Sequence, residues 1–158
     1  MHGVTRLKVT EDVSLIHFSS IPDDMKVIAD IFSRFAEAGV NIDMISQSAS
    51  KGSTVNLSFT APSEDIVKLL ATINRFREEY PLLDPMVSNG NCKIQLFGEE
   101  MRQMSGVAAH VFKTTAGVED MIFLITTSEV DISLLVDSHG VEETVKALEK
   151  EFGVTCEY

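Results

Sequence analysis

The chain has 158 residues, of which 44% are hydrophobic, and its formal net charge is −11. The 13 lysines and arginines are scattered singly, so the sequence lacks the basic clusters that nucleic acids and anionic membrane surfaces require. The longest fully apolar run, Met121–Ile125, is far too short for a transmembrane helix or a signal-peptide core. We therefore expect a globular cytoplasmic protein with no nucleic-acid or membrane partner.

The first half of the chain predicts one short strand at Val4–Val9, followed by the order strand, helix, strand, strand, helix, strand. Alternation of apolar and polar residues indicates the strands, and apolar residues at helical spacing indicate the helices. The expected elements are a strand at Val13–Phe18, a helix between Pro22 and Gly39, strands at Val40–Gln47 and Thr54–Phe59 joined by a turn at Lys51-Gly52, a helix between Pro62 and Pro81, and a strand at Asp84–Val87.

The second half repeats this order after a predicted turn at Asn89-Gly90-Asn91. The expected elements are a strand at Lys93–Phe97, a helix at Val107–Thr115, strands at Met121–Thr126 and Val130–Val136, a helix at Val141–Phe152 and a strand at Val154–Tyr158. Identical residues 80 positions apart, such as Phe32 and Phe112, accompany the repeated order and indicate an internal duplication.

Each βαββαβ unit predicts a four-stranded antiparallel sheet with two helices on one face. The predicted fold class is therefore α+β, with two ferredoxin-like domains at residues 11–88 and 89–158. The additional strand at residues 4–9 needs a partner for its backbone groups. We expect it to pair into the sheet of the second domain.

The histidines and cysteines predict no metal site, and we expect no cofactor. The four histidines do not have the spacing of metal ligands. Cys92 and Cys156 match no metal or redox motif, so both are expected to pack as small apolar side chains.

Two stretches carry a resemblance to a known family. The first reads GVTRLKV, then DVSLIHFSSIPDDMKVIADIFSRFAEAGVNIDMISQ, and the second reads MRQMSGVAAHVF, followed by LITTSEVDISLLVD. Together they resemble the tandem ACT region at the C-terminus of aspartokinase, over essentially the whole chain. The second stretch is similar to the Gly-Val-Ala-Ala helix start and the Ile-Ser-Thr-Ser-Glu strand of that family.

The resemblance implies a regulatory module that binds a small amino-acid effector such as lysine or threonine, without catalysis of its own. It also implies a homodimer with sheets side by side and a kinase domain, attached or separate. The resemblance implies that the effector binds at the domain interfaces. The implied ligand shell comes from the loop between the first strand and helix of a repeat and from the second strand of a facing ACT domain. Its residues are Asp23, Met25, Lys26, Val27, Gln47 and Ser48 in the first repeat, and Met104, Ser105, Gly106, Val107, Thr127, Ser128 and Glu129 in the second.

The first repeat departs from the family at its loop. Pro-Asp-Lys-Pro-Gly is usual there, but this chain has Met25 and Lys26 in place of the proline and glycine. The second loop keeps Gly106. The hypothesis is that the second site is functional and that Lys26 fills or alters the first, although Asp23 and Asp24 fit a helix cap as well as a ligand site.

Two other functions stay open from the sequence. A ligand-free dimerisation or interaction module is the main alternative, because sheets of this type pair at their edges. A remote alternative is an acylphosphatase-like enzyme with Arg102 in its phosphate loop. No glycine-rich phosphate loop of a kinase is present, so the chain is either a free-standing regulatory protein or a piece of a longer aspartokinase.

Overall fold

The computed structural model describes residues 3–49 and 52–158 and divides the chain into two compact units. We call Asp12–Asn89 the inserted unit, and we call residues 3–11 together with Gly90–Tyr158 the outer unit. The chain passes from one unit to the other twice, and the outer unit is therefore discontinuous in sequence. The turn predicted at Lys51-Gly52 includes Lys51, which lies outside the described residues.

Two long strands carry the chain through both units. Strand β1 spans Arg6–Pro22 and strand β4 spans Asp84–Phe97. The predictions of two separate strands before residue 18, and of a turn at Asn89-Gly90-Asn91, were wrong. Single residues in the left-handed region, Asp12 (φ +54°) and Gly90 (φ +71°), are accommodated within the strands. Because β1 and β4 are neighbours in the sheet order, pairing outweighs the local turn preference.

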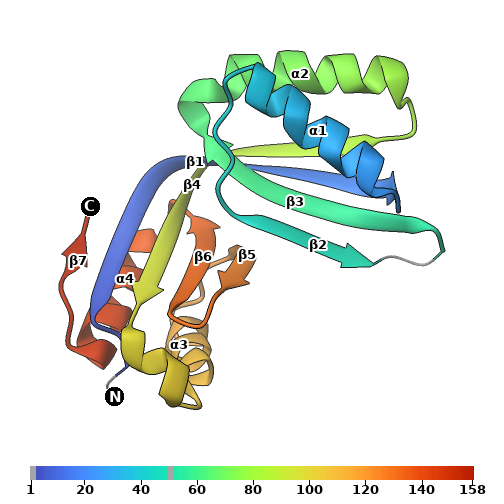
Figure 1. The fold of residues 1–158 in the computed structure, drawn as a ribbon. Helices are drawn as coiled ribbons and strands as arrows, with labels where there is room; N and C mark the ends of the chain where they lie inside the picture. Colours follow the sequence, from blue (N-terminus) through green and yellow to red (C-terminus); the bar gives the residue numbers. More distant parts are fainter. Residues whose placement is uncertain (1–2, 50–51) are drawn as a thin grey trace. The chain divides into compact units, whose positions relative to one another are not determined.

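The inserted unit has two helices on one face of its sheet (Figure 1). Strand β3 lies between β2 and β1 and pairs with both in the antiparallel sense. Strand β2 begins at residue 45 rather than at the predicted residue 40, because the N–H of Val40 bonds to the carbonyl of Phe35 at the end of α1. Its elements after β1 are α1 (Met25–Glu37), β2 (Ile45–Ala49), β3 (Thr54–Pro62), the 3₁₀ turn η1 (Ser63–Asp65) and α2 (Ile66–Glu79).

Aromatic packing forms the centre of the inserted unit. Phe18, Phe35, Phe59 and Phe76 are fully buried, and adjacent rings lie 5.2–6.5 Å apart between centroids. Offset and edge-on arrangements at these separations add to the stabilisation from apolar burial. The core thus joins α1 and α2 to the sheet beneath them.

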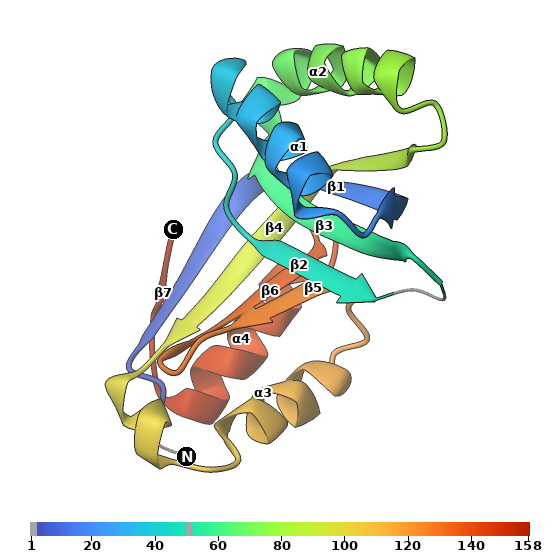
Figure 2. The same ribbon diagram turned by 45° about the vertical axis from the view of Figure 1, so that its right-hand side comes forward.

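The outer unit repeats the pattern, with α3 and α4 together on one face of its sheet (Figure 2). Strand β6 lies between β4 and β5 and is antiparallel to both. The first half of β1 belongs to this unit: Leu7 pairs with Cys156 of β7, and both Leu7 and Val9 are buried in its core. Its remaining elements are the 3₁₀ turn η2 (Glu99–Gln103), α3 (Val107–Ala116), β5 (Ile122–Thr127), β6 (Asp131–Asp137), α4 (Val141–Phe152) and β7 (Cys156–Glu157).

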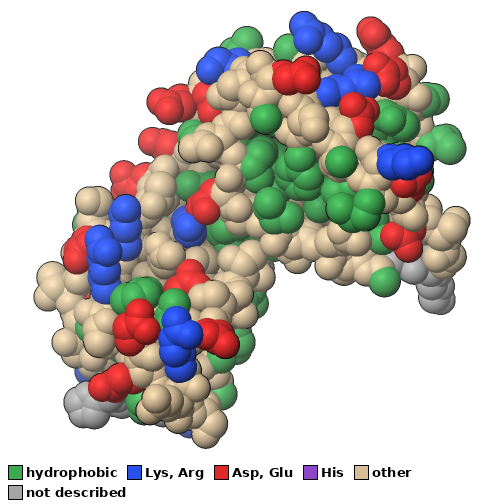
Figure 3. Space-filling model, viewed as in Figure 1, with side chains coloured by type: hydrophobic (Ala, Val, Ile, Leu, Met, Phe, Trp, Pro, Cys, Tyr) green, Lys and Arg blue, Asp and Glu red, His purple; other side chains and the backbone are tan. Residues whose placement is uncertain are grey.

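The surface carries charges of both signs and some exposed apolar groups. Acidic and basic side chains are interspersed on the face seen in Figure 3, where hydrophobic side chains also reach the surface of the inserted unit between α1 and β3. Within the described residues, no helix has the length and apolar character needed to cross a membrane.

Candidate functional site

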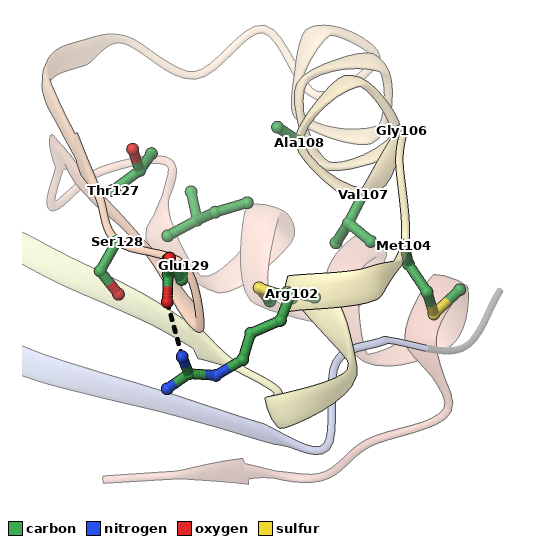
Figure 4. A pocket seen from close by; sticks show the side chains of 10 residues that line it. Arg102, Met104, Gly106, Val107, Ala108, Thr127, Ser128 and Glu129 are labelled. Carbon is green, nitrogen blue, oxygen red and sulfur yellow. Dashed lines mark hydrogen bonds and ion pairs between the residues drawn. The ribbon is translucent and has the colours of Figure 1, made fainter.

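A pocket of about 310 Å³ lies in the outer unit, near the lower end of the ~300–1,000 Å³ range of small-molecule sites. Three segments build it: the turn η2, the start of α3, and the turn between β5 and β6 (Figure 4). It is lined by Met101, Arg102, Met104, Gly106, Val107, Ala108, Thr127, Ser128, Glu129 and Ile132.

Gly106 begins helix α3 in a conformation that suits glycine. Its φ is +89° and its ψ is −1°, a left-handed geometry that side chains with a Cβ adopt only with strain. Its N-cap residue is Gly106 itself, which has no side chain to accept a hydrogen bond from the helix. The first N–H groups of a helix have no intrahelical acceptor, and the helix dipole is positive there. The start of α3 therefore offers donors to an anionic group in the pocket.

The hydroxyl of Ser128 shapes the turn between β5 and β6. Its Oγ accepts hydrogen bonds from the backbone N–H groups of Val130 and Asp131, both at 3.2 Å, and donates one to the carboxylate of Asp131. A serine hydroxyl has one donor and two acceptor positions, so this hydroxyl is fully used within the turn. Ser128 thus positions Thr127 and Glu129 and does not itself offer a free hydroxyl.

An ion pair lies at the pocket. Arg102 extends from η2, and its Nη1 donates to Oε2 of Glu129 at 2.5 Å (Figure 4). Its Nε lies 3.4 Å from the carboxylate of Glu99. The side chains of Arg102 and Glu129 are 52% and 77% exposed, and ion pairs this exposed contribute little to stability. Arg102 and Glu129 can therefore leave one another and bind other charged groups at little cost in free energy.

The remaining wall is mostly apolar. Val107 and Ile132 are buried in the core of the outer unit, and Met101 and Met104 pack against that core while half-exposed. Methionine side chains are flexible and polarisable, so they adapt to groups of different shape. The pocket thus combines helix N–H donors, one ion pair and a deformable apolar surface.

The sequence matches models of a known domain family in both units. Models of the ACT domain match residues 18–78, within the inserted unit, and residues 94–152, within the outer unit. This chain is a tandem ACT protein. The predicted α+β class with two βαββαβ repeats is confirmed, as is the likeness to the aspartokinase regulatory region.

Known relatives agree with the tandem ACT assignment. An aspartokinase of Geobacillus stearothermophilus is 29% identical over 157 residues, which cover 99% of this chain and 38% of the relative. The regulatory subunit of aspartate kinase from Thermus thermophilus, in its ligand-free form, is 25% identical with a TM-score of 0.85, over 95% of this chain and 99% of that one. The aspartate kinase of Synechocystis is 29% identical with a TM-score of 0.92, over 99% of this chain and 28% of that one.

The tandem ACT chain spans about a third of the length of the curated relatives it matches. It is nevertheless nearly the same length as the Thermus thermophilus regulatory subunit. The shared part is thus the regulatory region.

Most of the residues expected at the second site of the tandem ACT chain line the pocket. They are Met104, Gly106, Val107, Thr127, Ser128 and Glu129, whereas Ser105 is exposed beside it and is not among the lining residues. The sequence reasoning missed four of the lining residues, namely Met101, Arg102, Ala108 and Ile132. Ala108 directly follows the predicted Val107, and Ile132 lies in β6, just after the turn that carries the predicted Glu129. Met101 and Arg102 lie in η2, a turn that no periodic pattern indicated.

The residues expected at the first site lie around the start of α1 and on β2. Oδ1 of Asp24 accepts the backbone N–H of Lys26 at 2.9 Å and so caps the helix, while Asp23, Met25 and Lys26 are exposed. The side chain of Val27 packs against the core of the inserted unit. On β2, Gln47 and Ser48 are exposed and pair with β3. A cavity of this unit lies elsewhere, lined by Arg34, Glu37, Ala38, Thr72 and Arg75.

The chemistry of the pocket does not favour a metal or a phosphate. In the part of the chain that the structure describes, no three His, Cys, Asp or Glu side chains are grouped so that they could hold a metal ion. Arg102, the arginine of the acylphosphatase hypothesis, is engaged by two carboxylates, from Glu99 and Glu129. A phosphate brings no cationic group to compensate these two carboxylates, so they would repel it at the same place.

Proposed function

We propose that this tandem ACT chain is a regulatory module that binds a free amino acid in the outer-unit pocket. The observation that carries the proposal is the composition of this pocket: the uncapped start of α3, the carboxylate of Glu129 and a flexible apolar wall line one cavity. Its role is to sense the amino acid, and it has no catalytic activity of its own.

The three features match the three parts of an amino acid. N–H groups at the start of α3 favour the carboxylate, and Glu129 is a charged acceptor for the ammonium group. Gly106 lets the ligand approach the helix start, because a Cβ is absent there and no atom of the described residues lies within 4 Å of its position. The side chain of the ligand then faces the methionines.

The corresponding residues of the inserted unit offer a poorer site. Lys26 stands where the family has glycine, so a side chain lies at the start of α1, whereas Gly106 leaves the start of α3 open. The cap from Asp24 already satisfies one N–H of that helix end. We propose that the inserted unit contributes architecture and that ligand binding belongs to the outer unit.

The regulated partner that we propose is an aspartokinase catalytic domain, attached to this chain or separate. The support is that relatives of this chain are aspartokinases and that solved structures of the same length are regulatory subunits of aspartate kinase. Effector binding would bias two arrangements of the assembly, and such coupling is typically about 1–3 kcal/mol. A cytoplasmic location follows from the same proposal.

The test is thermal unfolding of the chain with each of the twenty amino acids at millimolar concentration. A ligand at about 100 times its dissociation constant adds roughly 2.7 kcal/mol to the free energy of unfolding. We expect a selective rise of the unfolding midpoint by several degrees with one amino acid or a related pair. A flat panel would contradict the proposal for the isolated chain.

Glycine substitutions locate the site. Gly106→Leu should abolish the ligand-induced shift, because a side chain then occupies the approach to α3. Gly52→Leu is the matched control: it has the same φ of +89° and open surroundings, but it lies in the inserted unit. Gly52→Leu and Lys26→Ala should leave the shift intact. Equal loss in Gly106→Leu and Lys26→Ala would show that both units form the site.

A ligand-free dimerisation module is the second candidate. The observation that favours it is apolar exposure on the two terminal strands of the sheet order: Ile45 on β2, and Phe123 and Ile125 on β5, are at least about a third exposed. Edge strands with exposed apolar groups tend to pair with another chain. We propose that the homodimer forms in either case, so only the amino-acid panel separates the two candidates.

A further inference from the structure

The charges that line the outer-unit pocket form a single pair. Among the described lining residues, Arg102 carries the positive charge and Glu129 the negative one, and their nearest atoms are 2.5 Å apart. All other described lining residues are uncharged: Met101, Met104, Gly106, Val107, Ala108, Thr127, Ser128 and Ile132. The pocket is therefore neutral, with one group of each sign at a common position.

We infer that the pocket is selective for zwitterionic amino acids with an uncharged side chain, and that Arg102 and Glu129 separate to hold the two charges of the ligand. This inference rests on the proposed function. Arg102 then joins the N–H groups at the start of α3 in facing the ligand carboxylate, and Glu129 faces the ligand ammonium group. One contact between opposite charges within the protein is replaced by two contacts to the ligand, so neither charge is left without a partner.

The ion pair between Arg102 and Glu129 can open at little cost in free energy. Both side chains are more than half exposed, so water and the long arginine stem allow them to move apart at little cost. Nε of Arg102 has Glu99 as a second partner at 3.4 Å. Glu99 anchors Arg102 near η2 when Nη1 turns to a ligand. A guanidinium suits this role because its several donors serve two acceptors at once.

The rest of the pocket excludes a second charge on the ligand. Once Glu129 binds the α-ammonium group, a lysine side chain would bring a cation to a wall made of Met101, Met104 and Ile132. An acidic side chain would likewise lack a second cation among the described lining residues. Charged groups are unfavourable beside apolar surface without a partner, whereas an aliphatic or thioether side chain packs against flexible methionines.

Norleucine and lysine provide the decisive comparison, because they have the same chain length and differ in the terminal ammonium group. By isothermal titration calorimetry on the full chain, norleucine should bind at least about tenfold more tightly than lysine. Norleucinamide and N-acetylnorleucine, which each lack one charge of the head group, should also bind at least about tenfold more weakly than norleucine.

Variants of the ion pair assign the two roles. Arg102→Gln and Glu129→Gln should each weaken norleucine binding at least about tenfold, with Arg102→Gln abolishing the preference over norleucinamide and Glu129→Gln the preference over N-acetylnorleucine. Arg6→Gln is the matched control, because Arg6 forms a similarly exposed ion pair with Glu157 in the same unit. It should leave binding unchanged.

The binding experiments distinguish a failure of this inference from a failure of the proposed function. Equal binding of norleucine and lysine would overturn this inference and leave the proposed function standing. Tighter binding by Arg102→Gln would also overturn it, because the arginine would then only compete with the ligand ammonium for Glu129. If none of the twenty amino acids nor norleucine binds the chain, the proposed function and this inference fail together.

Discussion

Asp131 is the residue on which the geometry of the candidate site depends. Its carboxylate accepts hydrogen bonds from Ser128, from Nε2 of Gln95 at 3.0 Å and from Oγ of Ser133 at 3.4 Å. Partial burial raises the pKa of Asp131, but these hydrogen bonds and the charge of Lys93 lower it by more, and its pKa lies below the ordinary value. The ionised form is therefore the one that holds the turn carrying Glu129.

Acid should weaken this turn. A carboxylate whose pKa is lowered on folding stabilises the fold above its unfolded pKa, near 3.9, and this contribution is lost as the pH falls through the lower folded value. Asp131→Asn should therefore be less stable than the unmodified chain at pH 6, and the difference should shrink below about pH 4. Urea unfolding at a series of pH values measures it, and a difference that does not change with pH would contradict this role for the charge.

Single residues of the site were predictable to different degrees. Gly106 and Glu129 stood out because their neighbours resemble family motifs. Ser128 was expected as a ligand residue, yet its hydroxyl is fully used in the turn. Arg102 was noticed only for another function, because its role depends on Glu129, which lies 27 positions away and meets it only in the folded unit.

At the scale of elements, helix α4 holds an acidic side chain from outside the helix next to its start. Its N-cap, Gly140, has no side chain to accept a hydrogen bond. Asp120, from the loop before β5, accepts the hydroxyl of Thr144 at 2.8 Å and the backbone N–H of Met121 at 2.8 Å. A Cβ on Gly140 would lie 2.5 Å from the carboxylate of Asp120. The glycine thus admits an acidic group next to the positive end of the helix.

Substitutions at these two positions should be non-additive. Asp120→Ala should cost about 1 kcal/mol, typical of a lost side-chain hydrogen bond. Gly140→Ala should cost about 1–2 kcal/mol, since Asp120 is held by two hydrogen bonds and cannot move aside freely. In the Asp120→Ala background the added methyl group meets no carboxylate, so its cost should vanish. Thermal or urea unfolding of the four variants measures the coupling, and purely additive effects would contradict the steric explanation.

The predicted boundaries of an element agree with the observed ones where apolar residues recur on one face of the element. Helix α4 spans Val141–Phe152, as the spacing of Val145, Leu148 and Phe152 predicted. The turn predicted at Asn89-Gly90-Asn91 is not formed. These residues lie within β4, which pairs with β1 and β6 on its two sides. Local chemistry therefore indicates helices better than it indicates long strands, whose pairing partners are distant in sequence.

At the scale of the whole molecule, the exposed edge strands predict self-association. Ile125→Lys on β5 and Ile45→Lys on β2 each place a charge on an exposed apolar site of a terminal strand. At least one of them should convert a dimer to a monomer in sedimentation velocity, because charges on edge strands oppose pairing. The control is Val67→Lys, a 77% exposed site on α2. A monomeric unmodified chain would contradict the proposed homodimer.

The sequence by itself determined the repeated order of elements, the α+β class and most of the residues that line the pocket at the start of α3. These depend on short-range periodicity and on motifs contained in one stretch of chain. Only the tertiary structure decided that β1 and β4 run unbroken, that Asp120 bonds to Thr144 of α4, and that Arg102 meets Glu129. Each of these depends on pairing or contact between segments far apart in the chain, and that contact outweighs the local preference of the residues involved.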